Sequence, residues 1–230
     1  MADDGCVLVI GGRGIGQEIA RHYADAGDDV VITCTSQAVA EEIATGIGGS
    51  TRGLELDLSK PESVRDAIAS VGPVRYLVLG AIERDENRVR SYSIADAMRL
   101  VTIKLVGYTE VIHVLLDRLS DDSAIVIFGG LAKERPYDGS TTVSTVNGGV
   151  VGMVRTLTKE LAPMRVNAIH PGIVEDSPYW KGKNLDAFIA RTPTGRLNRM
   201  ADIVDAVRFL LENQAVNGID LRVDGGWMTT

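Results

Sequence analysis

The sequence predicts an α/β fold: one domain over residues 1–230, with a doubly wound parallel sheet of seven strands and helices on both faces. Three observations predict it. Short apolar runs alternate with longer helical stretches along the chain, as in successive β-α-β units. Most of these runs lack polar alternation, which is typical of strands that helices cover on both sides. No repeat, linker or low-complexity tract divides the sequence, and its 45% apolar residues suffice for a substantial core.

The expected strands are short and rich in Val, Ile and Leu, and turn or helix signals separate them. In chain order they are Val7–Ile10, Val30–Cys34, Gly53–Leu56, Tyr76–Leu79, Ala124–Phe128, Arg165–Ile169 and Asp220–Val223.

The helices between the strands have ends that can be recognised. Ser59 and Glu62 form a capping box with Pro61 inside the first turn, which predicts a helix that continues through Ala69. Apolar residues at helical spacing predict three more helices: from Ser93 to about Leu119, from about Val143 to Leu161, and over Asp202–Leu211. The mixed, polar and aromatic stretch 174–196 is expected to form a lid.

The charge of the chain excludes some classes of partner. A net charge of −7 argues against sequence-independent nucleic-acid binding, which needs clustered Lys and Arg. No apolar run reaches the ~18 residues that span a bilayer, and the acidic start is unlike a signal peptide. We therefore expect a cytoplasmic protein that binds a small molecule, with neither nucleic acid nor membrane as partner.

Cysteine and histidine suggest no metal or redox chemistry. Cys6 and Cys34 lie on or beside apolar strands without C-x-x-C spacing, so we expect both to be buried and reduced. His22, His113 and His170 are far apart in the sequence and do not have the spacing of a metal site.

A glycine-rich turn joins the first expected strand to the first helix, in a segment that runs from Val7 to Ala20. Gly11 permits a tight turn, Gly14 lets the backbone approach a diphosphate, and Gly16 permits close packing of helix on strand. The helix that starts at Ile15 then offers free N–H groups and its positive dipole end to phosphate. This arrangement predicts a dinucleotide-binding fold of the Rossmann type.

The same turn resembles the T-G-x-x-x-G-I-G signature of the short-chain dehydrogenase/reductase family, shortened by one residue and with Ile10 in place of threonine. Further segments similar to that family follow in order at 56–59, 166–172, 192–197 and 216–226. The resemblance implies cofactor contacts near the adenine, after the fourth strand and beside the nicotinamide. The residues at these three places are Asp57 and Leu58, Gly80 and Ala81, and Pro171, Gly172 and Val174.

The end of the second strand bears on the choice of dinucleotide. Enzymes that use NAD usually place an Asp there for the ribose 2′-OH, and this strand carries none. Arg13, Thr35 and Ser36 are instead suited to a 2′-phosphate, so NADP(H) is preferred. NAD(H) stays possible if Arg13 is only a solvated loop charge and Ser36 only a helix N-cap.

The resemblance also implies where catalytic residues belong, and all four positions differ from the family. The usual Tyr and Lys, four residues apart, correspond to Val143 and Asn147, the usual Ser to Gly130, and the usual Asn to Lys104. Val143 holds no proton, and Gly130 has no side chain to donate a hydrogen bond. A slip in the alignment is the alternative, but no Y-x-x-x-K occurs near this point.

Asn and Lys are exchanged between two of these positions. We hypothesise that Lys104 and Asn147 share one cleft, where Lys104 supplies positive charge near the nicotinamide ribose or an anionic substrate group. The competing interpretation is a lysine on a helix surface that only extends its ammonium into water. Other candidate proton donors, none supported by spacing, are Thr141, Ser144, Thr145 and Tyr179.

Three functions fit this sequence. The first is an atypical NADP(H)-dependent oxidoreductase that acts on a small carbonyl or alcohol; the others are a dinucleotide-binding pseudoenzyme and a non-redox isomerase or dehydratase. In the family the helices expected at 93–119 and 143–161 pair between subunits, which implies a homodimer or homotetramer. The tail around Trp227 is expected to add an aromatic contact at another interface.

Overall fold

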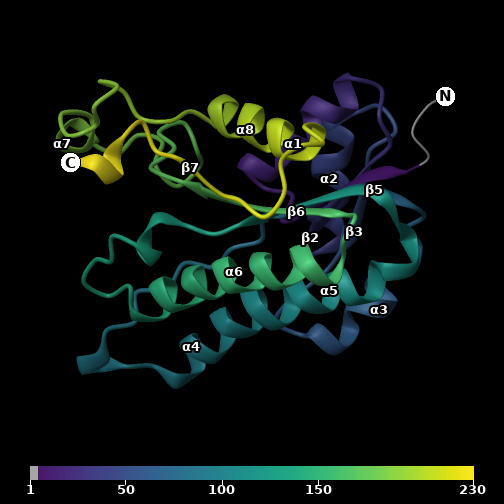
Figure 1. The fold of residues 1–230 in the computed structure, drawn as a ribbon, viewed down its shortest axis with the longest axis horizontal. Coiled ribbons are helices and arrows are strands. Elements are labelled where there is room, and N and C mark those ends of the chain that lie inside the picture. Colours follow the sequence, from purple (N-terminus) through teal and green to yellow (C-terminus); the bar gives the residue numbers. More distant parts are fainter. Residues whose placement is uncertain (1–4) are drawn as a thin grey trace.

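The computed structural model describes residues 5–230, in which seven parallel strands form a central sheet between two layers of helices (Figure 1). The strand order is β3-β2-β1-β4-β5-β6-β7, with every neighbouring pair parallel, so the predicted fold class is confirmed. The strands are β1 Cys6–Ile10, β2 Val30–Cys34, β3 Arg52–Glu55, β4 Val74–Leu79, β5 Leu119–Phe128, β6 Arg165–Pro171 and β7 Asp220–Val223.

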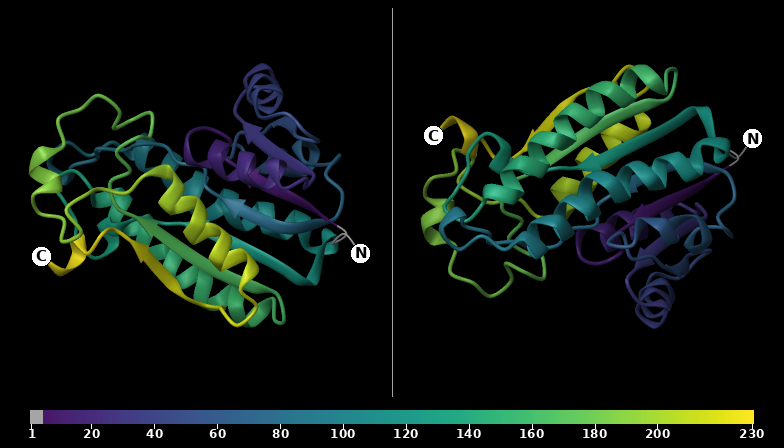
Figure 2. Two further views of the ribbon diagram at one scale, coloured as in Figure 1. Left: turned by 90° about the horizontal axis from the view of Figure 1, so that it is seen from above. Right: turned by 90° about the horizontal axis from the view of Figure 1, so that it is seen from below.

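Helices cover both faces of this sheet (Figure 2). Their bounds are α1 Ile15–Asp25, α2 Gln37–Ile47, α3 Val64–Ala67, α4 Ile94–Val101, α5 Tyr108–Leu115, α6 Thr141–Glu160, α7 Asp186–Ile189 and α8 Met200–Glu212. Successive side chains of a strand point to opposite faces. Val7 and Val9 of β1 accordingly pack in the apolar cluster of α1 and α8, while Leu8 and Ile10 pack in that of α5 and α6.

The long helix expected from Ser93 to about Leu119 is not continuous. A π turn over Thr102–Gly107 separates α4 from α5, and the chain leaves the helix before Leu119, which already belongs to β5. The π turn lies where the helix packs closely on the segment after β3, since a Cβ on Gly107 would be 3.0 Å from Leu58. Such turns are often found at functional sites, and Lys104 lies within this one.

The prediction of a capping box at Ser59 is also wrong. The Ser59 hydroxyl donates to Asp57 Oδ1 at 2.7 Å instead of capping a helix, and Lys60 takes the N-cap position. Short polar side chains often bond nearby groups in this way and compete with helix formation. A single 3₁₀ turn and the four-residue α3 follow, so the helix ends before Ala69.

The carboxyl ends of the strands lie at one edge of the sheet, and the segment 174–196, which we expect to form a lid, lies with the C-terminus at the same end of the molecule (Figure 1). This segment, called the lid below, is mostly loop, with one short helix, α7. Ligands of open parallel sheets bind at this edge. Within residues 5–230, no helix has both the length and the apolar character that crossing a membrane requires.

Candidate functional site

The turn between β1 and α1 requires glycine at the positions the sequence singled out. Gly11 has φ of 99°, and a Cβ on it would lie 2.6 Å from the Ala81 nitrogen. Gly14 has φ of 57°, in the left-handed region that favours glycine. A Cβ on Gly16 would lie 2.0 Å from the Gly11 carbonyl oxygen. The helix therefore starts directly against the end of the first strand, as predicted.

The start of α1 can accept an anion. The backbone N–H groups of Gly14 and Ile15 donate to no acceptor within the described residues, and Gly14, at the N-cap, has no side chain to cap them. Unpaired N–H groups at a helix start suit a diphosphate. Pro178 of the lid approaches this point, because a Cβ on Gly14 would be 3.3 Å from Pro178 Cδ. The turn thus fits the phosphates of a dinucleotide beneath the lid.

The residues proposed for a 2′-phosphate gather at the end of β2. Arg13 is exposed and lies beside the Cys34 thiol. Burial raises the pKa of this thiol, and the nearby guanidinium partly offsets that rise. Thr35 is exposed, and Ser36 is at the N-cap of α2 with its hydroxyl in no capping bond. The Ser36 side chain therefore does not cap α2, and its hydroxyl stays available for another partner.

One carboxylate near this point was missed from the sequence. Glu55 pairs with Cys34 in the parallel register, and its carboxylate accepts from the Gln37 N–H at 3.0 Å. This carboxylate comes from β3, the parallel neighbour of β2, which ends at the same edge of the sheet. A carboxylate at this edge matters for the choice between NAD(H) and NADP(H), because it would repel a 2′-phosphate.

The segment after β3 has a fixed turn. Asp57 accepts hydrogen bonds from the Ser59 N–H at 3.0 Å and from its hydroxyl. Burial acts to raise the pKa of Asp57, but these bonds outweigh it and the net pKa is lowered. Leu58 is buried beside this turn. The carboxylate is thus used within the turn, which leaves the backbone at 57–58 as the part that could face an adenine.

Two further backbone segments border the same edge of the sheet. After β4, the Gly80 N–H donates to the Ile10 carbonyl at 2.9 Å, and the Tyr108 hydroxyl donates to the Ala81 carbonyl at 2.5 Å. After β6, the Gly172 N–H donates to the Val223 carbonyl at 2.8 Å. Pro171 ends β6, and Val174 is buried in the apolar cluster that α1 and α8 share.

The structure brings Gly130 and Asn147 together at the end of β5. A Cβ on Gly130 would lie 2.7 Å from Asn147 Nδ2, so the amide occupies the space that a larger residue at 130 would need. Asn147 is 4% exposed, and its amide bonds no other residue in the part of the chain described. Val143 lies in the first turn of the same helix, α6. The site thus presents one free buried amide.

Lys104 is not a surface residue, so the interpretation of a lysine that extends into water is wrong. It is 2% exposed, because the π turn faces the sheet, and its Nζ donates to the Phe128 carbonyl at 2.7 Å. Burial lowers the pKa of Lys104 to about 8. Lys104 and Asn147 thus contact the same strand end, residues 128–130, from two helices.

His170 has a role that the sequence did not reveal. Its ring is fully buried, Nδ1 accepts the Gly130 N–H at 3.0 Å, and Nε2 consequently carries the proton toward Asp220 at 3.2 Å. Burial lowers the pKa of His170, which favours this neutral form. A Cβ on Gly129 would lie 2.3 Å from the ring. His170 therefore fixes the backbone of the glycine pair that ends β5.

Nearby hydroxyls are mostly engaged. Ser144 shares a 2.9 Å hydrogen bond with Ser140, and Thr145 donates to the Thr141 carbonyl at 2.9 Å. Thr142, which the sequence analysis passed over, has a buried hydroxyl without a hydrogen-bond partner. No group of three or more His, Cys, Asp or Glu within residues 5–230 is placed to hold a metal ion.

Known proteins resemble the chain over nearly its whole length. A family model described as enoyl-(acyl carrier protein) reductase matches residues 9–228. Carbonyl reductase family member 4 from Danio rerio is 31% identical and is covered over 96% of both chains. The 3-oxoacyl-[acyl-carrier-protein] reductase of Mus musculus is 30% identical over 99% of both chains.

Solved structures also resemble the chain over nearly its whole length. A short-chain dehydrogenase/reductase, SDR:Glucose/ribitol dehydrogenase, from Brucella melitensis matches with a TM-score of 0.91 at 26% identity, over 98% of this chain and 97% of that one. A 3-ketoacyl-(acyl-carrier-protein) reductase from Brucella melitensis complexed with NADH has a TM-score of 0.87 at 26% identity, over 99% and 100%. A blue fluorescent protein from a metagenomic library, in complex with NADPH, has a TM-score of 0.87 at 26% identity, over 98% of each chain.

Proposed function

Because the chain belongs to the short-chain dehydrogenase/reductase family of oxidoreductases, we propose that it is an NADP(H)-dependent oxidoreductase with a non-standard active site. Its substrate in this proposal is a small carbonyl compound or the corresponding alcohol. The whole chain acts as one dinucleotide-binding domain, with residues 174–196 as the lid over the substrate.

The observation that carries the proposal is that the buried ammonium of Lys104 and the free amide of Asn147 both lie against the end of β5. A lysine whose pKa lies near 8 stays protonated at neutral pH, yet gives up its proton far more readily than an exposed lysine. Both side chains contact the strand end 128–130, where the resemblance places the catalytic Ser of the family, at Gly130. Positive charge and a hydrogen-bond donor are thus present although the family's Tyr, Lys and Ser are absent.

When bound, the nicotinamide coenzyme supplies the hydride that reduces a carbonyl carbon, or accepts it in the reverse direction. The carbonyl oxygen also needs a proton. In our proposal Lys104 Nζ holds that proton, releases it to the oxygen directly or through one water, and regains it from solvent. Asn147 Nδ2 donates to the same oxygen and orients it.

Arg13, Thr35 and Ser36 support the preference for NADP(H), since they offer one cation and two hydroxyls to a 2′-phosphate. Glu55 supports the alternative of NAD(H), because its carboxylate would repel that phosphate. The Glu55 carboxylate already accepts a hydrogen bond from the Gln37 N–H at the start of α2. We therefore retain NADP(H) as the preferred coenzyme.

NADPH consumption tests the function. We expect the wild-type protein to consume NADPH with some member of a panel of ketones, quinones and acyl thioesters, and Lys104→Met to lose at least ~100-fold in rate, the lower end for a positioned acid. Lys159→Met is the matched control, because Lys159 is exposed on α6. Equal rates in Lys104→Met and the control would contradict the role of Lys104.

A second function, a dinucleotide-binding pseudoenzyme, is favoured by one specific observation. Val143 and Gly130 offer no proton and no side-chain hydrogen bond at positions where the family has both. This candidate predicts saturable NADPH binding without consumption across the panel. That result would replace the oxidoreductase proposal.

The proposal includes self-association. Six large hydrophobic side chains from the end of β4 through the π turn are exposed, and exposed apolar residues that gather in one region mark an interaction site. They are Ile82, Val89, Tyr92, Ile94, Met98 and Val106. We place a homodimer or homotetramer interface on this surface, with α6 beside it.

A further inference from the structure

Four aromatic side chains form a continuous series at the lid end of the molecule. The ring centroids of Tyr179 and Trp180 are 4.8 Å apart, those of Trp180 and Phe188 6.0 Å, and those of Phe188 and Trp227 5.9 Å. Trp227 lies in the C-terminal tail, so the tail packs on its own lid. We call Tyr179, Trp180, Phe188 and Trp227 the aromatic row.

Cations lie against one end of the aromatic row. The Arg84 guanidinium is 3.2 Å and Lys183 Nζ is 3.3 Å from the centroid of the Tyr179 ring. Two groups cannot share one face at such distances, so they lie on opposite faces with only the ring between them. Their mutual repulsion is not offset by any carboxylate within 4.0 Å in the described chain.

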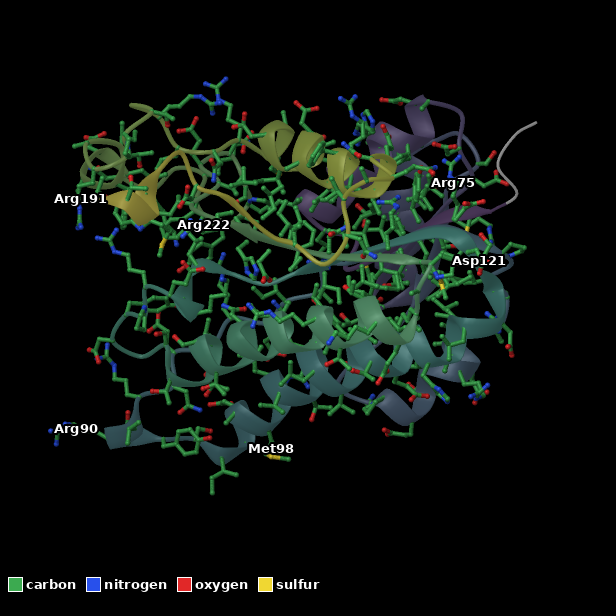
Figure 3. All side chains as sticks on the ribbon, in the orientation of Figure 1. Arg75, Arg90, Met98, Asp121, Arg191 and Arg222 are labelled. Carbon is green, nitrogen blue, oxygen red and sulfur yellow. The ribbon has the colours of Figure 1, made fainter. Side chains whose placement is uncertain are left out.

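The other end of the aromatic row is similar. Arg135 lies 4.7 Å and Arg191 4.9 Å from the centroid of the Trp227 ring, and Arg191 lies beside the C-terminal segment in Figure 3. Arg135 also donates to the Trp227 carbonyl at 2.8 Å. We call Arg84, Arg135, Lys183 and Arg191 the rim cations.

The rim cations have no ionic partner although the chain is acidic. Within residues 5–230 none of the four has a carboxylate within 4.0 Å, although the net charge is −7. Other unpaired arginines, such as Arg90 and Arg155, are isolated on the surface, whereas the rim cations gather around one series of aromatic rings. Stacking on an aromatic ring is a weak interaction that leaves the charge uncompensated, so the rim cations keep most of their capacity to bind an anion.

The rim cations also converge on the reaction edge of the sheet. Arg84 follows β4, Arg135 follows β5, and Lys183 and Arg191 belong to the lid after β6. The lid reaches the phosphate turn at Pro178. A substrate that enters beside the coenzyme would therefore pass the rim cations first.

A hollow of about 600 Å³ in the lid is a less suitable site for an anion. Trp180 and Lys183 line it, but so do the carboxylates of Glu175, Asp176 and Asp186. The favourable surface is the side of the lid at which Arg84 and Arg135 meet the aromatic row.

We infer that the rim cations and the aromatic row bind the substrate as a small planar organic anion. The rim cations hold its carboxylate or phosphate through charge-assisted hydrogen bonds, and its flat apolar part packs on Trp180 or Trp227. This inference rests on the proposed function for its meaning, because it names the substrate class of that site. Binding at the rim does not require hydride transfer.

The two tryptophans of the chain both lie in the aromatic row, so tryptophan fluorescence, excited selectively over the tyrosines, reports on this surface. Benzoate and benzamide are matched probes, an anion and its neutral analogue. With saturating NADP⁺, we expect benzoate to change the fluorescence with a Kd at least tenfold below that of benzamide. Arg84→Gln with Lys183→Gln should raise the benzoate Kd at least fivefold. Arg155→Gln, an exposed site on α6, should leave it unchanged.

Equal affinity for the two probes, or no saturable change with either, overturns the inference. So does a benzoate Kd that the double variant leaves unaltered while its circular dichroism matches wild type. Binding of an acidic protein to this surface without benzoate binding would also overturn it. The melting-temperature shift with NADPH is measured in parallel, so failure at the rim is distinguished from failure of the proposed function.

Discussion

At the scale of single residues, the buried Lys104 dominates the site. Its ammonium has one hydrogen bond, to the Phe128 carbonyl, and no carboxylate partner among the described residues. Water stabilises a charge better than this environment does, and burial consequently lowers the pKa. A residue kept at this energetic cost is better explained by function than by packing.

This cost makes stability depend on pH. Between pH 8 and 10.5 the unfolded chain keeps the Lys104 proton that the folded chain releases, so stability rises with pH across this window. Lys104→Met removes the buried charge but leaves one carbonyl unpaired, and we expect a net gain of about 1–2 kcal/mol at pH 7. Urea unfolding at pH 7 and pH 10 measures this gain. A loss of stability at pH 7, or a gain that stays the same at pH 10, would contradict it.

Arg13 determines the coenzyme preference in our account. Arg13→Ala should weaken NADPH binding about tenfold, the value of one charge-assisted contact, and leave NADH binding unchanged. Fluorescence titration with the two coenzymes measures the change, and Arg21→Ala on α1 is the control because Arg21 is directed to Glu18 and the Gly46 carbonyl. Equal losses for both coenzymes would mean that Arg13 does not contact the 2′-phosphate.

At the scale of elements, the end of β5 and the start of α6 act together. A side chain at 130 collides with the Asn147 amide, so Gly130→Ser alone should destabilise the protein by about 1–3 kcal/mol. Combining Gly130→Ser with Asn147→Lys and Val143→Tyr removes that amide and restores three of the family's four residue types. We expect this triple variant to acquire general carbonyl reductase activity. A folded, NADPH-binding triple variant without such activity would contradict the alignment of these positions.

Elements buried on both faces were the most predictable from sequence. Val30–Cys34 has the bounds expected, because an apolar run between turn signals marks such a strand clearly. The glycine turn was predictable because backbone geometry there excludes side chains. The π turn could not be predicted, because helical periodicity continues through it and its close contact with Leu58 comes from a segment distant in sequence.

The site was predictable only in part. The resemblance to the family pointed to Gly130, Asn147 and Lys104, but it did not show that Lys104, which lies in the π turn, is buried. His170 and Glu55 were missed because their partners, Gly130 and Gln37, are distant in sequence or on a neighbouring element. The Ser59 cap failed because Asp57, two residues before it, competes for the same hydroxyl.

At the scale of the whole molecule, the exposed apolar residues of α4 predict self-association. Met98 projects away from the body of the protein in Figure 3 and is 60% exposed. Ile94→Glu with Met98→Glu places two charges on this surface and should shift light-scattering mass toward the monomer of 24.6 kDa. Glu substitutions at Ala38 and Thr45, both exposed on α2, serve as controls. A wild-type monomer at all concentrations would contradict this interface.

The central claim is that the start of α1 holds the diphosphate of a nicotinamide dinucleotide. Its most direct test is the melting temperature of the wild-type protein and of Gly14→Val with millimolar NADPH or NADH, because a ligand of the folded state raises that temperature by mass action. We predict a rise for wild type, larger with NADPH, and none for Gly14→Val, whose side chain would be strained at φ of 57° and would meet the ligand. No rise with either coenzyme in wild type would contradict the account.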